Sequence, residues 1–266
     1  MQIPFKKIGG VALSAMAIAV STASAVPVPG GTLDPLTIPK YVTPLVIPPV
    51  MFDDGGVPMN VSVALRQFQQ RILPQQDING NPLPATTLWG YCDGNTVGTG
   101  SCNNPGFTME VTRGQTTTVT WKNELVDAAG GFLPHVITDA LDNPVVDQTL
   151  HWAAPNQDCK EGIPRTDCAG ASAAPYTGPT PMVTHVHGAH VGPISDGFPE
   201  AWWLPAALDI PAGYATEGTF YDDINGGAPG TGTAVYAYNN DQPSTTLWYH
   251  DHSLGMTRLN VYAAGA

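Results

Sequence analysis

Proline and glycine are spread along this whole chain, and they limit how long any helix or strand can be. The 266 residues include 29 glycines and 26 prolines, about a fifth of the total. Proline removes a backbone hydrogen-bond donor and breaks a helix interior, while glycine favours turns. The apolar residues lie in short runs between them, and none shows a convincing amphipathic helical period. The sequence therefore predicts an all-β fold with short strands and long loops.

Alternation of apolar and polar residues marks the expected strands. Phe-Thr-Met-Glu-Val-Thr at 107–112 alternates cleanly, and Thr-Val-Thr-Trp at 118–121 is rich in β-forming residues. Several short strands between turn residues favour a β-sandwich. The expected strands lie at residues 59–72, 86–91, 107–112, 116–121, 182–186 and 245–250, with weaker ones at 213–220 and 233–238 and a last one that begins at 259–262.

The first 25 residues have the three parts of an export signal. Lys6 and Lys7 give a basic start, an apolar run covers 8–20, and Ala-Ser-Ala at 23–25 is a small-residue cleavage site. An N-terminal membrane anchor is the alternative, although the run is short for a bilayer span. We expect a signal peptide at 1–25 and an exported protein, periplasmic or extracellular, with no membrane segment after cleavage.

The next segment, residues 26–58, is rich in proline and is expected to form an extended arm rather than a domain. The chain is also acidic, with a formal charge of −12. Removal of residues 1–25 leaves eight Lys and Arg against 22 Asp and Glu, or −14. A chain this acidic is a poor candidate for binding nucleic acid, so no nucleic-acid partner is expected.

Four cysteines suggest local disulfides in an exported protein. They are Cys92, Cys102, Cys159 and Cys168. Short spacing favours Cys92–Cys102 and Cys159–Cys168, but four cysteines allow three pairings, and free thiols are the alternative. None of the four lies next to a histidine, so metal ligation by a thiolate is not expected.

Two His-x-His pairs are the strongest chemical signal. They lie in Thr-His-Val-His-Gly at 184–188 and in Trp-Tyr-His-Asp-His at 248–252. Residues i and i+2 of a strand point to the same face, about 6.6 Å apart, so each pair projects two imidazoles into one space. Four imidazoles suit borderline metals such as copper or zinc. The alternative is two chance pairs of exposed or hydrogen-bonded histidines.

The stretches around these histidines carry a family resemblance. The first continues with Ser-Asp-Gly-Phe-Pro-Glu-Ala-Trp at 195–202, and the second extends as Leu-Trp-Tyr-His-Asp-His-Ser-Leu-Gly-Met-Thr-Arg-Leu-Asn-Val-Tyr-Ala at 247–263. Both resemble copper motifs of the multicopper oxidases, in the branch of bilirubin oxidase and spore-coat laccase. Segments 87–91 and 108–114 resemble the same branch, and the similarity covers about residues 40–266.

The resemblance implies a fold and a set of copper ligands. The fold is a cupredoxin-like Greek-key β-sandwich, and the site is a trinuclear copper cluster held by four His-x-His pairs, two from the first domain and two from the last. His185 corresponds to a ligand of the type 2 copper. His187, His250 and His252 correspond to ligands of the type 3 pair. Asp196 corresponds to an acidic residue that helps to deliver protons during oxygen reduction, with a simple turn role as the alternative.

The family's type 1 copper site has no counterpart in this sequence. That site needs a His-Cys-His motif, which the sequence lacks. Residues 59–266 therefore resemble the first cupredoxin domain, truncated at its C-terminal end, and the missing C-terminal cupredoxin domains are expected partners. Met256 is no type 1 ligand, Trp202 and Trp203 are expected in the core, and the remaining histidines are expected to be solvated or to support the site indirectly. These are His135, His151 and His190.

The resemblance implies an oxidoreductase that takes electrons singly from a reducing substrate and reduces O₂ to water. The sequence does not identify that substrate. The fragment alone is expected to be inactive because half of the cluster ligands and the type 1 site are absent. Two alternatives stay open: a copper-binding module without turnover, and an exported zinc hydrolase.

Overall fold

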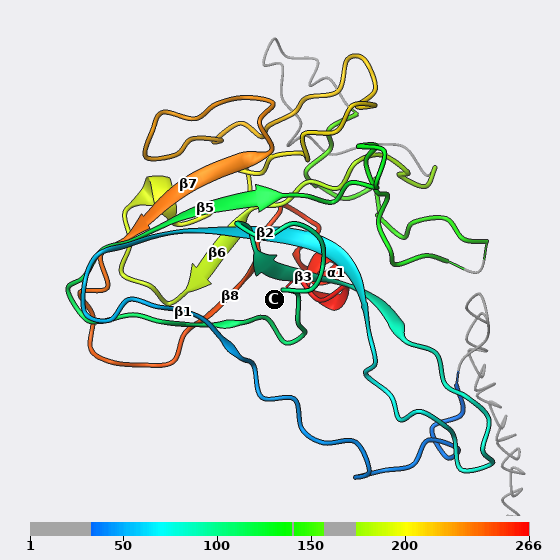
Figure 1. Ribbon diagram of the computed structural model, residues 1–266. Coiled ribbons are helices and arrows are strands. Elements are labelled where there is room, and N and C mark those ends of the chain that lie inside the picture. Colours follow the sequence, from blue (N-terminus) through cyan, green and yellow to red (C-terminus); the bar gives the residue numbers. More distant parts are fainter. Residues whose placement is uncertain (1–32, 140, 157–173, 266) are drawn as a thin grey trace, which may run out of the picture.

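The computed structural model describes residues 33–139, 141–156 and 174–265 (Figure 1). The expected signal segment, Cys159 and Cys168 lie outside these residues. The strands are β1 (Val50–Asp53), β2 (Met59–Gln70), β3 (Thr86–Asp93), β4 (Thr108–Glu110), β5 (Thr117–Asn123), β6 (Thr184–His187), β7 (Thr233–Tyr238) and β8 (Trp248–Asp251). A 3-10 turn, η1 (Pro193–Ser195), and a helix, α1 (Thr257–Tyr262), complete the described elements. The predicted all-β class is confirmed.

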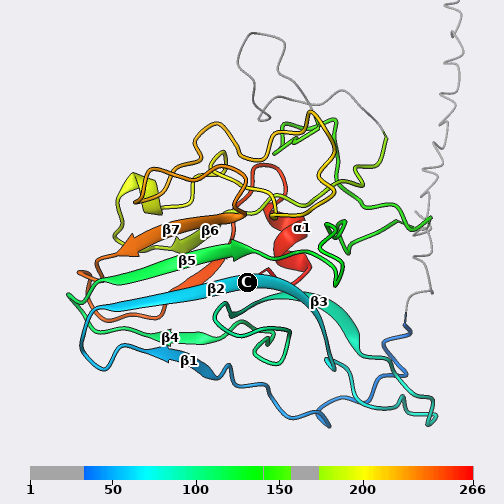
Figure 2. The same ribbon diagram turned by 45° about the horizontal axis from the view of Figure 1, so that its top comes forward.

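The main sheet has four strands in the order β3-β2-β5-β7 (Figure 2). The outer pairs β2–β3 and β5–β7 are antiparallel, whereas β2 and β5 run parallel. Strand β5 shows why the sequence folds this way, because Thr117, Val119, Trp121 and Asn123 are buried and the residues between them are half-buried. This period of two gives the sheet one face that packs on the core.

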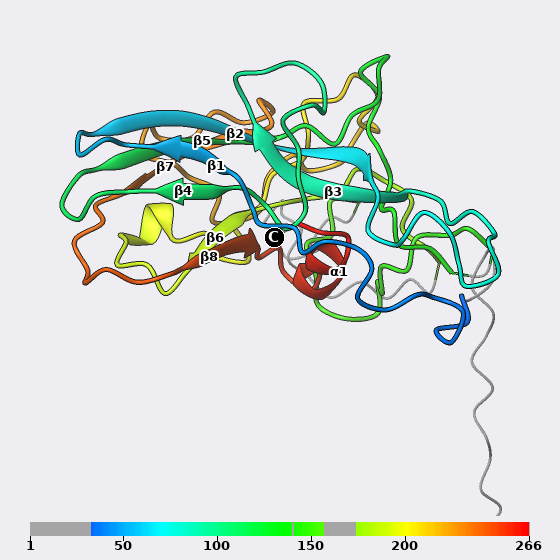
Figure 3. The ribbon, with the colours of Figure 1, turned by 60° about the horizontal axis from the view of Figure 1, so that its bottom comes forward.

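Strands β6 and β8 form a separate antiparallel pair, here called the histidine ribbon, on one side of the main sheet (Figure 3). Aromatic side chains join the ribbon to the main sheet. Tyr249 of β8 lies 5.2 Å from Tyr91 of β3 and 5.6 Å from Trp121 of β5, measured between ring centroids. Trp202 and Trp203 are fully buried in the same core, as predicted. The main sheet and the ribbon are the two layers of a sandwich. The ribbon packs on the sheet with the face that carries Tyr249, and its opposite face points away from the sheet.

The predicted strand that begins at 259–262 is wrong, because residues 257–262 form helix α1. The local sequence Leu-Asn-Val-Tyr alternates like a strand, but burial follows a helical period. Met256, Leu259, Asn260 and Ala263 are buried, while Tyr262 is exposed. Positions three and four apart share one face of a helix, so this short helix presents one buried face to the rest of the molecule.

The weaker strand expected at 213–220 is also absent as a named strand. An isolated bridge joins Glu217 to Trp203, and the Gly218 amide donates to the Trp202 carbonyl. A Cβ at Gly218 would lie 2.1 Å from the Glu200 carbonyl oxygen, so the segment runs too close to its neighbour for a regular ladder of side chains. The weaker strand at 233–238 is confirmed as β7.

Within its described residues, 33–58, the proline-rich segment contributes one short strand. Strand β1 at its end pairs in parallel with β4, and residues 33–49 before it form no strand. Tyr41 and Leu45 are almost fully exposed there. No helix in the described part of the chain is long and apolar enough to cross a membrane.

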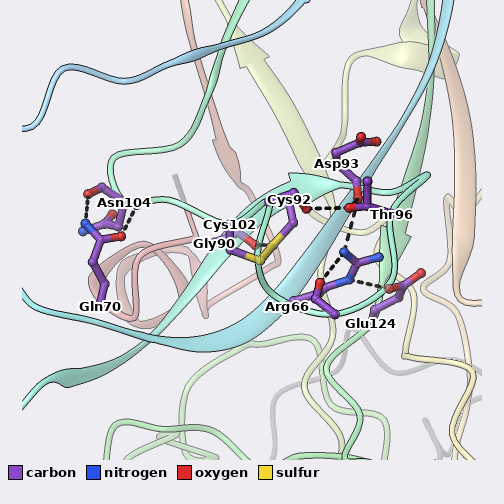
Figure 4. Close-up of a disulfide and its surroundings, with 11 residues drawn as sticks. Arg66, Gln70, Gly90, Cys92, Asp93, Thr96, Cys102, Asn104 and Glu124 are labelled. Carbon is purple, nitrogen blue, oxygen red and sulfur yellow. Dashed lines mark hydrogen bonds and ion pairs between the residues drawn. A yellow bond between two sulfur atoms is a disulfide. The ribbon is translucent and has the colours of Figure 1, made fainter.

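Cys92 and Cys102 form a disulfide beside the end of β3, with Cα atoms 4.4 Å apart (Figure 4). The bridge closes the exposed loop that follows Asp93. Arg66 holds the same loop from β2, because its guanidinium donates to the carbonyls of Asp93 and Gly98 and pairs with Glu124 at 2.7 Å. The loop is thus fixed at both ends to the main sheet.

Candidate metal centre

The register of the histidine ribbon brings the two His-x-His pairs together. His185 lies directly opposite His250, and His187 lies opposite Trp248. Directly opposite residues of an antiparallel pair share a face, and so do residues two apart on one strand. His185, His187 and His250 therefore occupy one face, and His252 follows β8 in the same phase. The pairing of β6 with β8 thus brings the four imidazoles together, as the spacing predicts.

The four rings form a compact group. The His185 ring centroid lies 5.6 Å from His187, 5.6 Å from His250 and 5.0 Å from His252. His187 Nδ1 lies 3.3 Å from His250 Nε2. Ligand atoms of His185, His187 and His250 all lie within 4.8 Å of one another, as in a candidate metal site. His187 is exposed, so the group opens to solvent.

Backbone carbonyls orient two of the rings. His185 Nδ1 donates to the Asp196 carbonyl at 2.5 Å, and His250 Nδ1 donates to the Asp251 carbonyl at 2.7 Å. A carbonyl only accepts, so in each neutral ring Nδ1 carries the proton and Nε2 keeps its lone pair. The second nitrogen of a metal-binding histidine is typically fixed in this way. Both rings thus present Nε2 as a possible ligand atom.

Asp196 lies beside His185, where a tight turn holds it. Gly197 has a φ of +76°, and a Cβ there would lie 2.2 Å from the Thr184 carbonyl oxygen, so only glycine allows this approach to β6. Ser195 fixes the turn to β7 by accepting from the Ala237 amide at 3.0 Å. Asp196 Oδ1 then lies 3.5 Å from His185 Nδ1, and its side chain is partly exposed. The turn role and a role near the histidines are therefore compatible.

Comparison with known proteins gives relatives of one kind. A laccase of Bacillus subtilis (strain 168) is 29% identical over 228 residues, covering 86% of this chain and 32% of that protein. A laccase of Haloferax volcanii is 30% identical over 233 residues, 85% of this chain and 30% of that protein. Multicopper oxidase LPR1 of Arabidopsis thaliana is 29% identical over 181 residues, which cover 68% of this chain and 22% of that protein. No family model matches the chain.

The chain belongs to the multicopper oxidase family. It spans a third or less of the length of each of these relatives. A cupredoxin-like β-sandwich is the fold expected for this family, and the two facing layers of strands agree with it.

The donor set of this multicopper oxidase chain fits a copper ion. Two nitrogens that share one ion at about 2.0–2.1 Å lie at most about 4.2 Å apart, so His187 and His250 are close enough to share one. Within the described residues, His252 Nδ1 is buried and has no hydrogen-bond partner. An orphaned buried nitrogen costs free energy unless a metal or another partner satisfies it. Imidazole is a ligand that copper accepts readily.

Protonation also favours metal binding here. Burial lowers the pKa of His250, and the neighbouring rings of His185 and His187 lower it further, against the hydrogen bond to the Asp251 carbonyl. Burial likewise lowers the pKa of His252, followed by the effects of His185 and His250. A histidine must be neutral to bind a metal, so these shifts keep both rings ready as ligands near neutral pH.

Trp248 is a part of the site that sequence reasoning missed. Its ring stacks on His250 at a centroid distance of 4.1 Å and on His187 at 5.5 Å, and it is half exposed. The side chain thus covers one side of two rings that could bind a metal. Alternation along β8 could have indicated it, because residues 248, 250 and 252 share a face.

Of the other three histidines, two are exposed and one is buried. His190 is exposed, and its Nδ1 lies 3.3 Å from Asp241. His151 is exposed as well. His135 is buried, and its Nε2 lies 3.0 Å from the Asn260 side-chain oxygen. None of these three joins the four rings of the ribbon.

Asp251 is the second residue that sequence reasoning missed, although it lies inside the second His-x-His pair. Its side chain is fully buried on the ribbon face opposite the histidines. Burial raises the pKa of Asp251 to about 6, against hydrogen bonds from Ser253, Asn260 and Val183 that lower it. A pattern search for metal ligands could have proposed Asp251 as one, whereas the structure turns it away from the imidazoles.

Proposed function

We propose that this chain supplies half of the histidine ligands of a trinuclear copper cluster in an exported multicopper oxidase. The observation that carries the proposal is the shared face of His185, His187 and His250, with His252 beside them. The remaining ligands and the type 1 copper would lie in a part of the protein that this sequence does not include. The relatives, roughly three or more times as long as the matched part, support that division.

Each residue has a proposed task. His185 would bind the type 2 copper, and its Nδ1 is already engaged by the Asp196 carbonyl. His187, His250 and His252 would bind the type 3 pair. Asp196, partly exposed beside His185, would hold and pass a proton toward the cluster. Copper, when bound, supplies one-electron redox chemistry toward O₂, and the protein sets its ligands and their hydrogen bonds.

The chain alone should bind copper weakly and show no oxidase turnover. Four imidazoles at an open face leave metal positions unfilled, and the sequence contains no His-Cys-His motif for a type 1 site that would take electrons from a reducing substrate. The missing C-terminal cupredoxin domains are the partners that would close this face. Export is part of the proposal, and the N-terminus of the secreted protein should then be Val26.

The test compares the chain with the complete protein that contains it. The first step is to read the gene beyond codon 266 for a His-Cys-His motif. The complete protein should be blue, oxidise a phenol and consume O₂, and each of the variants His185→Ala and His250→Ala should stop O₂ uptake while sparing the blue colour. Oxidase activity in the isolated chain, or intact O₂ uptake in both variants, would overturn the proposal. Copper binding without turnover in the complete protein would favour a copper-binding module, and zinc-dependent hydrolysis a hydrolase.

A further inference from the structure

We propose that Asp251 and Asn260 are positioning residues that set the register and spacing of the four histidines from the opposite face of the ribbon. The proposal rests on the proposed function in so far as the histidines are copper ligands. It adds two residues that would not touch the metal.

Both carboxylate oxygens of Asp251 are fully used. Oδ1 accepts from the Val183 amide at 3.1 Å and lies 2.9 Å from the Ser253 hydroxyl. Oδ2 accepts from the Ser253 amide at 3.0 Å and from the Asn260 side-chain amide at 2.8 Å. The Ser253 hydroxyl also lies 3.2 Å from the Pro181 carbonyl, so it shares one proton between two acceptors. A fully buried ion needs such a set of donors.

These bonds hold the segment that leads into β6. The Val183 amide donates to the Asp251 carboxylate, and the Val183 carbonyl accepts from the His252 amide at 2.8 Å. Both backbone groups of Val183 are therefore bound by residues of the second histidine motif. His185 follows only two residues later. A slip of one residue would turn the strand's side chains to the other face, so this double contact protects the pairing of His185 with His250.

Asn260 connects the carboxylate to helix α1 and to the segment before β6. Its amide nitrogen donates to Asp251 Oδ2 and also to the Pro181 carbonyl at 3.1 Å. Its oxygen accepts from His135 Nε2 at 3.0 Å. Both the NH₂ group and the oxygen of the Asn260 side chain are therefore hydrogen-bonded, and the side chain cannot rotate without breaking a buried bond.

His135 completes the network in one tautomer. The Ile137 amide donates to His135 Nδ1 at 3.1 Å, so the proton lies on Nε2 and points at Asn260. The indole ring of Trp89 packs edge-on against the imidazole, with centroids 4.6 Å apart. A chain of buried hydrogen bonds therefore runs from His135 through Asn260 to Asp251, whose neighbours in sequence are His250 and His252.

Both carboxylate oxygens of Asp251 accept hydrogen bonds, and this makes a specific test possible. Asp251→Asn keeps the shape but replaces one oxygen with an NH₂ group. At the δ1 position this group would face the Val183 amide, and at the δ2 position it would face the amides of Ser253 and Asn260. In either orientation a buried backbone donor loses its acceptor. The contact that fixes the ribbon should therefore loosen although no histidine has changed.

Asp223 offers a matched control. It is also buried, and its carboxylate accepts from the amides of Asn225, Gly227 and Val235, none of which belongs to the histidine ribbon. Asp223→Asn should cost stability by the same physical route. It should leave the imidazoles as they are. Ser253→Ala is a milder second variant, which removes one donor to Asp251 and should fold even if Asp251→Asn does not.

The experiment measures the chain in two states. In the metal-free chain, imidazole nitrogen NMR reports the rings of His250 and His252. In the chain titrated with Cu²⁺ alone, electron paramagnetic resonance reports the copper and its affinity. Asp251→Asn should shift the ring signals, change the copper spectrum and weaken copper binding by about 10–100-fold, a typical effect of residues that support metal ligands. Ser253→Ala should move the same signals less, and Asp223→Asn should leave them unchanged.

The two hypotheses fail separately. If Asp251→Asn and Ser253→Ala leave the ring signals and the copper spectrum of the original chain, the positioning role is wrong. If Asp223→Asn moves them equally, the effect is general loss of stability and the positioning role is again wrong. If the original chain takes up no copper but Asp251→Asn still shifts the ring signals, the proposed function fails and the positioning role stands.

Discussion

The two faces of the histidine ribbon, formed by the same two strands, differ in almost every physical property. One face packs on the core through Val186 and Tyr249. On that face both oxygens of the Asp251 carboxylate accept hydrogen bonds from buried donors. The other face carries the imidazoles, leaves His252 Nδ1 without a partner among the described residues, and exposes His187. One face is saturated with contacts, and the other keeps its donor atoms available.

The contacts that stabilise the ribbon and the imidazoles proposed to bind metal therefore lie on opposite faces of the same two strands. Buried polar groups are normally paired, and an unpaired one in a native fold needs an explanation. The saturated face explains how the strands are held in register. The unsaturated face carries imidazoles with free lone pairs, which are the atoms that we propose as metal ligands.

The largest effect on stability should come from Tyr249, and its neighbour Trp248, which points to the opposite face of the ribbon, is the matched control. Tyr249→Ala should lower the free energy of unfolding by about 3–5 kcal/mol, because it opens a cavity against Tyr91 and Trp121. Trp248→Ala, on the histidine face and half exposed, should lower it by less than about 1 kcal/mol. Urea unfolding of both variants checks this, and equal losses would contradict a division between the faces.

The next effect should appear as a dependence on pH. Burial lowers the pKa of His135 from 6.5 to about 4, against the hydrogen bond to Asn260 that raises it. The fold favours the neutral ring, so this contribution is complete above pH 6.5 and is lost as the pH falls from 6.5 toward 4, by up to about 3 kcal/mol. His135→Gln cannot titrate. The stability difference between the original chain and this variant should shrink across that window, and a constant difference would contradict the assignment.

The disulfide should matter for stability and not for copper. Cys92 and Cys102 are 10 residues apart in sequence, so loss of the bridge should cost about 2–3 kcal/mol in the chain-entropy model. Unfolding of the double variant Cys92→Ala with Cys102→Ala, or of the reduced chain, measures this cost. Copper titration of the same variant should match the original chain. Weakened copper binding would instead tie the loop to the site.

The smallest effect on stability should come from the histidines themselves. His187→Ala should change the free energy of unfolding of the metal-free chain by no more than about 0.5 kcal/mol, because its ring is exposed. His185→Ala should cost about 1 kcal/mol, because it removes the hydrogen bond to the Asp196 carbonyl. The same variants should lose most of their copper binding. Calorimetric unfolding without metal, followed by copper titration, separates the two effects. A large loss of stability without metal would place these rings in the structural part of the fold.

The sequence predicts the site better than its support, and the reason is physical. A period of two along a strand is enough to place His185 with His187 and His250 with His252 on one face each. The register that joins the pairs depends on Val183 and Asn260, which lie 68 and nine residues from Asp251. Such partners leave no local pattern. They become visible only when the folded chain brings them together.

Helix α1 illustrates the same limit. Its six residues are too few to express a helical period against an alternating Leu-Asn-Val-Tyr pattern, and tertiary contacts decide the outcome. Asn260 and Met256 are buried because the helix packs beside β8, and Asn260 there reaches Asp251. By contrast, β2 and β5 are longer, and apolar residues alternate with polar or small ones along them, so the sequence predicts both strands directly.

The most direct test of the central claim is X-ray absorption at the copper edge of the chain loaded with Cu²⁺. The original chain should show nitrogen neighbours at about 2.0 Å with the outer-shell scattering of imidazole rings, as copper bound to histidine requires. The matched protein is a variant in which His185, His187, His250 and His252 are all replaced by Ala. It should lose the imidazole scattering and most of the bound copper. Copper that stays bound with an unchanged spectrum in that variant would contradict the claim that these four histidines form the metal site.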